Sequence, residues 1–232
     1  NLSDIAAMAG NSLAAVISVA LSRERDMEFA RELHHGLLEL ADEFGVALAG
    51  GDTNIWDGPL VLSVTLLGET TEKGPVRRSG ARVGDWIMTT GCFGGSLSGK
   101  HVSFQPRVKE ALQLHDTVTL HAMIDVSDGL ATDLHHILDE SNVGAVLYEE
   151  SIPISDASEQ INDEKTSLEH ALGDGEDFEL LFSVSADDGR QLLADPPIDV
   201  RLSHIGEMIE AGCRELADAA GNRKPLPRTG WV

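Results

Sequence analysis

A long amphipathic stretch between two short apolar runs determines how the first third of this chain can fold. Apolar side chains recur at helical spacing over residues 26–44, which predicts one helix that begins at about Asp26 and ends before Gly45. The runs 13–21 and 46–49 are predicted strands, and the first of them is expected to be buried. A further apolar strand is expected over residues 60–67.

Residues 70–82 are polar, contain Gly74-Pro75 and separate this part from the rest of the chain. Beyond them, helices are predicted over 106–114 and 127–141, and strands over 85–90, 123–126, 143–148, 178–184 and 200–206. Strands and helices do not alternate strictly, which favours an α+β fold over a doubly wound sheet. We therefore expect two domains: residues 1–72, a mixed sheet with helices, and residues 73–232, a larger α+β domain.

Acidic residues strongly outnumber basic ones in this chain. There are 39 Asp and Glu against 17 Lys and Arg, which gives a formal charge of −22. A nucleic-acid-binding protein needs a basic surface, so this composition excludes that class. A polyanionic substrate would be repelled unless metal ions neutralised its site. Most of the negative charge is interpreted as solvated surface.

The cysteines and the hydropathy pattern bear on the cellular setting. Cys92 and Cys213 form neither a disulfide framework nor a zinc motif, and no apolar run reaches membrane-spanning length. We expect a cytoplasmic protein with no membrane partner. Because the chain begins at Asn1, without Met and inside a motif, an upstream segment is also expected.

The motif Asp125-Val126-Ser127-Asp128-Gly129-Leu130 stands where a predicted strand becomes a helix. Asp125 and Ser127 point to the same face of an extended segment, and Asp128 opens the helix. Such a turn can hold a metal ion through its carboxylates while backbone N–H groups meet a phosphate. The alternative is an N-cap Ser127 followed by an Asp that the helix dipole favours. That alternative leaves Asp125 unexplained, since a carboxylate after three apolar residues is costly unless it is paired.

Two further motifs place oxygen ligands next to glycine or at a helix start. Gly50-Gly51-Asp52-Thr53 is predicted to end a strand, with glycines that admit a phosphate and Asp52 for its metal; an ordinary turn is equally compatible. Asn1-Leu2-Ser3-Asp4 indicates a short helix over residues 3–9 with Ser3 as N-cap.

Other candidate residues give weaker signals. In 173–177, Glu176 can face a cationic ligand, although an acidic surface turn is equally compatible. The glycine-rich stretch 91–99 lacks the P-loop pattern and is predicted to be a flexible loop. Arg77-Arg78 can clamp a phosphate. The pairs His34-His35 and His135-His136 lack zinc-helix spacing and are expected at the surface or an interface. No serine or cysteine nucleophile motif is present, so no covalent catalytic residue is expected.

Taken in order, these motifs resemble the thiamine-monophosphate kinases, which share a superfamily with aminoimidazole ribonucleotide synthetase and selenophosphate synthetase. The similarity covers essentially the whole chain through NLSDIAAM, VALAGGDT, RRSGARVGDWIMTTG, IDVSDGLATDLHHIL, GEDFELLF and a terminal GW. GGDT, RRSGA and GEDFELLF together favour the thiamine-phosphate branch. The resemblance implies the two-domain α+β fold of that superfamily, with nucleotide, Mg²⁺ and dimer contacts in residues 1–72.

The resemblance also implies roles for individual residues. Mg²⁺ ligands would be Asp4, Asp52, Asp125 and Asp128; ATP contacts would be Gly51, Asp52, Arg78 and Ser127; contacts to the thiamine end of the substrate would be Glu176 and Trp231. The implied reaction is in-line transfer of the ATP γ-phosphoryl group to thiamine monophosphate. That reaction needs positioning and charge neutralisation rather than a covalent nucleophile. A homodimer is implied as well.

The chain departs from the family pattern at two places. Family members carry Gly-Asp-Asp and Thr-Asp metal ligands upstream of the position of Asn1, and Gly-Gly-Glu-Asp where this chain has Asp174-Gly175-Glu176-Asp177. Two alternatives therefore stay open. One is a superfamily enzyme that acts on another small acceptor. The other is a homolog that dimerises and binds ligand without turnover.

Overall fold

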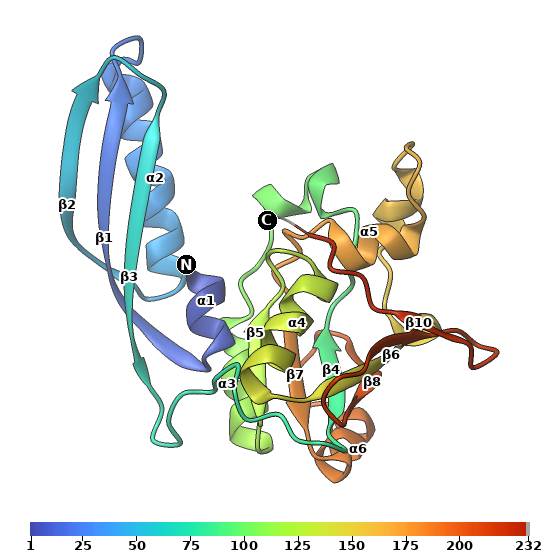
Figure 1. Cartoon of the computed structure of the whole chain (residues 1–232). Helices are drawn as coiled ribbons and strands as arrows, with labels where there is room; N and C mark the ends of the chain where they lie inside the picture. The colour runs from blue at the N-terminus through green and yellow to red at the C-terminus, as the bar shows by residue number, and fades with distance from the viewer. Residues whose placement is uncertain (231–232) are drawn as a thin grey trace.

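The computed structural model describes residues 1–230 and contains two β-sheets with helices packed around them (Figure 1). The N-terminal part comprises α1 (Leu2–Ala7), β1 (Gly10–Ser22), α2 (Met27–Glu43), β2 (Ala47–Trp56) and β3 (Val61–Thr70). The C-terminal part comprises the helices α3 (Val108–Thr117), α4 (Leu130–Ser141), α5 (Ser167–Gly173) and α6 (Ala186–Ala194), and the strands β4 (Trp86–Thr90), β5 (Ala122–Asp125), β6 (Gly144–Tyr148), β7 (Leu180–Val184), β8 (Leu202–Ile209), β9 (Arg214–Ala217) and β10 (Arg223–Pro225). This architecture confirms the predicted α+β class.

The N-terminal sheet is mixed, as predicted, with the strand order β2-β1-β3. Strand β1 pairs parallel with β2 and antiparallel with β3. Helix α2 begins where the sequence indicates, because the Asp26 side chain accepts a hydrogen bond of 2.9 Å from the Phe29 amide. The helix covers one face of the sheet, where Ile17, Leu48 and Leu66 pack with its apolar side.

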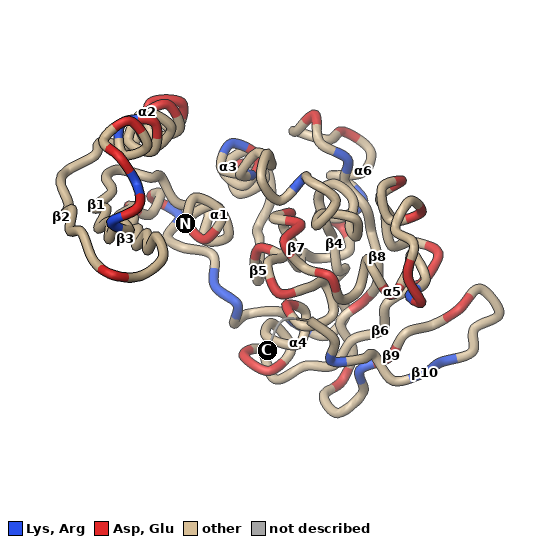
Figure 2. Tube along the Cα trace, turned by 90° about the horizontal axis from the view of Figure 1, so that it is seen from above, with Lys and Arg blue, Asp and Glu red and all other residues tan. Residues whose placement is uncertain are grey.

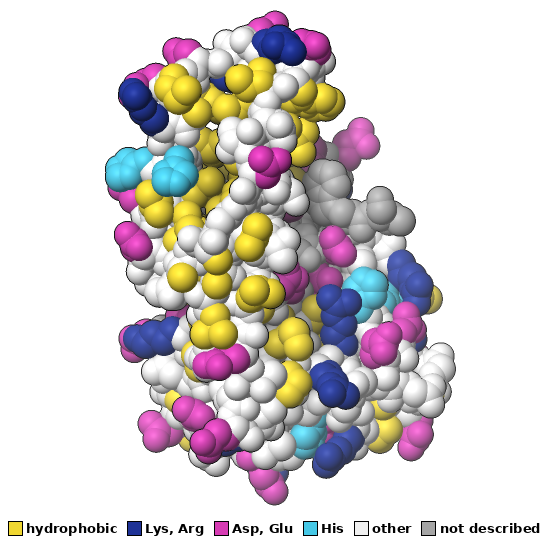
Figure 3. All heavy atoms as spheres, turned by 90° about the vertical axis from the view of Figure 1, so that its left-hand side faces the viewer, with side chains coloured by type: hydrophobic (Ala, Val, Ile, Leu, Met, Phe, Trp, Pro, Cys, Tyr) yellow, Lys and Arg dark blue, Asp and Glu magenta, His cyan; other side chains and the backbone are white. Residues whose placement is uncertain are grey.

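The opposite face of the N-terminal sheet carries exposed apolar side chains. Ala14 pairs with Leu67, and Ala20 pairs with Val61, so these residues share a face with Val16. The exposed fractions are 40% for Val16, 46% for Val61 and 55% for Leu67. Figure 3 shows hydrophobic side chains gathered over the N-terminal part of the molecule. The expectation that the first strand is buried therefore holds for one of its faces only.

The prediction that Gly50-Gly51-Asp52-Thr53 ends a strand is wrong, because all four residues lie inside β2. A Cβ atom on Gly51 would lie 1.8 Å from the Ile17 carbonyl oxygen of β1. Glycine at this position therefore lets β1 and β2 approach closely enough to pair, next to a register irregularity at Ala15/Val16. Gly50 and Gly51 disfavour a strand locally, but pairing with β1 lets β2 continue past them.

The C-terminal sheet has seven strands in the order β10-β9-β6-β8-β4-β7-β5, and β6–β9 is its parallel pair. Successive apolar residues on one strand enter different cores, as the alternation of side chains requires. Ile87, Ile124 and Leu181 belong to the core under α4 and α5. Their neighbours Met88, Met123 and Phe182 belong to the core that α3 covers. Both faces of this sheet are therefore buried.

Helix α1 connects the two parts of the molecule. Its Ala6 and the following Ala9 lie in the same core cluster as Leu114 of α3 and Met123 of β5. The helix begins at Leu2 with Asn1 at the N-cap, so the prediction of Ser3 as N-cap is wrong. Ser3 instead lies inside the helix with its side chain buried, which makes its hydroxyl available to a partner in the C-terminal part.

Candidate active site

Asp125 is the last residue of β5 and is buried, with 5% of its surface exposed. The Ser3 hydroxyl of α1 donates a hydrogen bond of 2.6 Å to its carboxylate. Burial raises the pKa of Asp125 from its usual value, the Ser3 hydrogen bond opposes this, and the nearby Asp4 carboxylate raises the pKa further. A cation between Asp4 and Asp125 would offset both the burial of the Asp125 charge and its repulsion by Asp4. This pair therefore has the chemistry of a cation site.

Asp4, Asp125 and Arg78 line one cleft of about 400 Å³ between α1, the end of β5 and the connection between the two sheets. Arg77 lies on the same cleft, and its carbonyl accepts a hydrogen bond of 3.0 Å from the Met123 amide. Figure 2 shows the basic positions of this connection where it runs between the two parts of the chain. The cleft thus combines three carboxylates, those of Asp4, Asp125 and Glu140, with the guanidinium groups of Arg77 and Arg78.

The turn after Asp125 is organised by Asp133, which sequence reasoning missed. The Asp133 carboxylate accepts hydrogen bonds from the amides of Ser127, Asp128 and Gly129 at 3.1, 3.0 and 3.1 Å. Burial raises the pKa of Asp133 to about 7, while these N–H groups favour its ionised form. Helix α4 starts at Leu130 with Gly129 at the N-cap, so the capping alternative for Ser127 is wrong.

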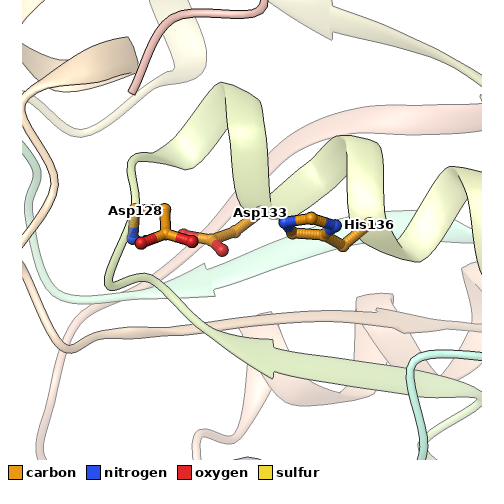
Figure 4. A group of neighbouring side chains, drawn as sticks. All are labelled: Asp128, Asp133 and His136. Atoms are coloured by element: carbon orange, nitrogen blue, oxygen red, sulfur yellow. The ribbon is translucent and has the colours of Figure 1, made fainter. Parts of the chain in front are cut away.

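Asp128, Asp133 and His136 form a second group of potential ligands (Figure 4). One ligand atom of each lies within 4.8 Å of the others. The spacing of Asp133 and His136, three residues apart on α4, is a signal that would have placed them on one helix face. The preceding His135 is buried and accepts a hydrogen bond of 2.9 Å from Arg214, so the expectation of a surface or interface position for it is wrong.

Glu176 lies directly beside the turn that contains Ser127. Its amide donates a hydrogen bond of 2.8 Å to the Ser127 carbonyl, and the Phe178 amide donates one of 2.8 Å to the Val126 carbonyl. The structure therefore brings the predicted substrate residue next to the predicted nucleotide residue. Glu176 and Phe178 have φ angles of +57° and +51°, which are unusual for residues other than glycine.

The acidic residues on both sides of Glu176, Asp174 and Asp177, are buried, so the alternative of an acidic surface turn is wrong. Asp177 and Glu179 each have 1% of their surface exposed. Asp177 accepts hydrogen bonds from the Gly94 amide, which anchors the glycine-rich stretch 91–99. That stretch forms the 3₁₀ turn Ser96–Ser98, where the Ser96 hydroxyl donates to the Glu176 carbonyl.

Gly51 and Asp52, two further predicted site residues, do not line the cleft that Asp4 and Asp125 share. Gly51 and Asp52 line a different cavity, which lies between the N-terminal sheet and α2. Asn54 donates a hydrogen bond of 2.6 Å to the Asp52 carboxylate. Trp231 lies outside the described residues.

Comparison with known proteins places the chain in a family. Residues 1–70 match the model of AIR synthase related protein, N-terminal domain, and residues 82–216 match that of the C-terminal domain. The chain is 44% identical to a thiamine-monophosphate kinase of Rhodopirellula baltica, over 90% of this chain and 66% of that protein. It is 36% identical to one of Methanospirillum hungatei, over 100% of this chain and 77% of that protein. The chain belongs to the thiamine-monophosphate kinase family.

Solved structures agree with this assignment. The crystal structure of thiamine-monophosphate kinase from Stenotrophomonas maltophilia is 33% identical, with a TM-score of 0.80 over 93% of this chain and 75% of that one. The structure described as AaThiL complexed with AMPPCP and TMP is 25% identical, with a TM-score of 0.80 over 100% of this chain and 76% of that one. The chain thus spans about two thirds to three quarters of the length of its thiamine-monophosphate kinase relatives. Among residues 1–230, no helix is both long and apolar enough to cross a membrane.

Proposed function

We propose that this protein transfers the γ-phosphoryl group of ATP to the phosphate of thiamine monophosphate, which gives thiamine diphosphate and ADP. The observation that supports the proposal is the hydrogen bond between the backbones of Glu176 and Ser127, the residues proposed to contact the acceptor and the nucleotide. The relatives named above are thiamine-monophosphate kinases, and one related structure holds AMPPCP and TMP together.

The proposed step is a direct in-line displacement. An oxygen of the acceptor phosphate forms a bond to the γ-phosphorus, and the bond from that phosphorus to the β,γ-bridging oxygen breaks. The electron pair of the broken bond leaves with ADP. No protein nucleophile is needed, and the site contributes by positioning both phosphates and by stabilising their charge.

We propose Mg²⁺ at the carboxylates of Asp4, Asp125 and Asp128. Their hard oxygen ligands fit this ion, and the pKa of Asp125, raised first by burial and further by the Asp4 carboxylate, indicates that a cation would stabilise the ionised pair. When bound, Mg²⁺ neutralises phosphate charge that an acidic protein would otherwise repel. Arg78 lines the same cleft and is proposed to contact ATP, together with Ser127. The proposed roles of Gly51, Asp52 and Trp231 rest on the family resemblance.

We also propose that the protein acts in the cytoplasm as a homodimer. The support for the dimer is the sheet face that bears the exposed apolar side chains of Val16, Val61 and Leu67. A second copy would cover this face by sheet packing. Sedimentation analysis tests the dimer. Leu67→Glu places a charge on the proposed interface and is expected to give monomers, whereas an unsubstituted protein that is already monomeric would contradict the proposed dimer.

A coupled assay of ADP release tests the activity. The protein is expected to release ADP only when ATP, Mg²⁺ and thiamine monophosphate are all present. A panel of other small phosphate acceptors tests the alternative of a different substrate. Calorimetric titration with an ATP analogue and Mg²⁺ tests the alternative of a binding homolog, since binding without turnover on any acceptor would contradict the proposed kinase.

A further inference from the structure

Glu179, three residues after Glu176, is a buried carboxylate to which the proposed reaction gives no role. Glu179 accepts hydrogen bonds from Arg107 Nε and a terminal nitrogen of the same guanidinium at 2.7 Å each. Lys100 Nζ donates to it at 2.9 Å, and the Thr90 hydroxyl donates at 2.8 Å. A Cβ atom on Gly91 would lie 2.2 Å from this carboxylate, so the chain leaves room for it only with glycine there.

Glu179 pairs with two cations inside the protein, Lys100 and Arg107. Burial alone would raise the pKa of Glu179, but the hydrogen bond from Arg107 and the charges of Lys100 and Arg107 lower it from its usual value. The pKa of Arg107 is raised, first by its hydrogen bond to Glu179. The carboxylate is therefore ionised at neutral pH, and each cation has its partner in the same network.

Lys100 and Arg107 are the first and last residues of the loop 100–107, which we call the anchored loop. Glu179 thus ties both ends of the loop to the segment that follows Glu176. The middle of the loop makes a separate contact, since the Phe104 ring stacks on Phe178 with the ring centroids 3.9 Å apart and the planes at 14°. Three contacts from one loop therefore converge on residues 178 and 179.

The segment that the loop contacts also carries backbone strain. Glu176 and Phe178 are half-buried and adopt positive φ angles, whereas Asp177 and Glu179 between and after them are buried. Such conformations persist where the surroundings determine them, and they concentrate at functional sites. The anchored loop packs on this segment through Phe104, and the Val126–Ser127 backbone forms hydrogen bonds with it.

We propose that Glu179 is a positioning residue for the phosphate acceptor, acting through the anchored loop, and that Phe104 determines the acceptor preference. By fixing Phe104 on Phe178, Glu179 sets an aromatic wall two residues from Glu176, which suits an acceptor that combines a flat cationic ring with a phosphate. This inference rests on the proposed function and adds residues to its acceptor side. Among the contacts described for residues 1–230, the side chains of Arg78 and Ser127, on the nucleotide side, do not contact the anchored loop or the Glu179 carboxylate; the two sides meet through backbone hydrogen bonds such as that between Glu176 and Ser127.

The test compares Glu179→Gln, Phe104→Leu and the control Val102→Ala, which changes an exposed side chain of the same loop. Steady-state kinetics with thiamine monophosphate and with ATP would be measured on the intact protein, with thermal unfolding of each variant as a check of folding. We expect both Glu179→Gln and Phe104→Leu to raise KM for thiamine monophosphate about tenfold, while KM for ATP changes less than about twofold. Val102→Ala is expected to leave both constants unchanged.

A role in general stability alone would give a different result. Equal increases of both KM values, or a lower kcat with unchanged KM values, would overturn the proposal. Because Glu179→Gln removes a buried charge, Arg107→Lys serves as a second variant that keeps the charge and loses the two-point contact; an intermediate KM for thiamine monophosphate is expected.

The failure of the proposed function can be told apart from the failure of this inference. Calorimetric titration of thiamine monophosphate in the presence of Mg²⁺ and a non-hydrolysable ATP analogue measures acceptor binding directly. No binding to the unsubstituted protein would overturn the proposed substrate, and the acceptor role of Glu179 with it. Binding to the unsubstituted protein and equally tight binding to Phe104→Leu and Glu179→Gln would overturn this inference alone.

Discussion

The Glu176 amide donates a hydrogen bond of 2.8 Å to the Ser127 carbonyl and so fixes the distance between two halves of the site. Ser127 belongs to the turn that follows β5, whose amides are gathered by Asp133. Glu176 belongs to the strained segment that precedes β7. Because β5 and β7 are neighbours in the sheet, the pairing of the strands itself delivers these two residues to one place.

The first prediction concerns Glu176. Glu176→Gln is expected to raise KM for thiamine monophosphate about tenfold, because the side chain loses the negative charge proposed to contact the cationic acceptor, while KM for ATP stays unchanged. Steady-state kinetics with each substrate varied in turn check this. Glu159→Gln, at an exposed carboxylate in the turn Asp156–Gln160, is the matched control. An increase confined to KM for ATP would contradict the assignment of Glu176 to the acceptor.

The second prediction concerns the contact between α1 and β5. Ser3→Ala removes the hydroxyl that donates to buried Asp125, so the free energy of unfolding is expected to fall by about 1–3 kcal/mol. Ser12→Ala is the control, because the Ser12 hydroxyl is buried and has no hydrogen-bond partner; its removal is expected to be neutral or slightly stabilising. Urea unfolding of the two variants checks the difference. Equal losses would show that the Ser3–Asp125 hydrogen bond contributes nothing specific.

The third prediction concerns the close approach of β1 and β2. Gly51→Ala places a Cβ atom against the Ile17 carbonyl, and the backbones have to separate. A loss of several kcal/mol in the free energy of unfolding is expected, at the upper end of single substitutions. Gly36→Ala, on helix α2 with open space around it, is expected to stabilise by about 0.5–1 kcal/mol. Thermal unfolding ranks the two; a Gly51→Ala protein as stable as the original would refute the steric argument.

Much of this fold follows from local patterns in the sequence. Helix α2 was predictable because its cap at Asp26 and its apolar stripe are both local signals. The strands β5 and β7 were predictable because they are short apolar runs, although the sequence does not specify that they pair with each other. The sequence singled out Asp125 because a carboxylate directly after three apolar residues needs an explanation, and Asp128 because it opens the helix that follows.

What the sequence did not reveal depends on contacts between distant residues. Gly51 permits a strand to continue because of Ile17, about which a local turn pattern carries no information. Ser3 resembles an N-cap by position, but its partner is Asp125 in another part of the fold. In the sequence, Glu179 and Arg107 resemble ordinary surface charges. They pair because the anchored loop packs on the residues just before β7. Periodicity and capping rules describe neighbouring residues, so they cannot predict these contacts, which join residues far apart in the sequence.

The fourth prediction concerns Asp177, whose pKa is raised to about 7, chiefly by burial, while the Gly94 amide and Lys100 oppose the shift. Between pH 4 and pH 7 the folded protein retains a proton on Asp177 that the unfolded chain has released. The free energy of unfolding therefore falls as pH rises through this window, by up to about 1.4 kcal/mol per pH unit from this group. Below the window both states are protonated, and above it both are ionised, so the contribution is constant outside it.

Asp177→Asn removes this titration and keeps an acceptor for the Gly94 amide. The variant is expected to lose less stability than the unsubstituted protein between pH 5 and pH 8, by about 2–3 kcal/mol. Urea unfolding of both proteins at the two pH values isolates the difference, since every other titrating group is common to them. An identical pH dependence of the two proteins would contradict the prediction. It would mean that Asp177 is ionised over the whole range, because the Gly94 amide and the charge of Lys100 outweigh the effect of burial.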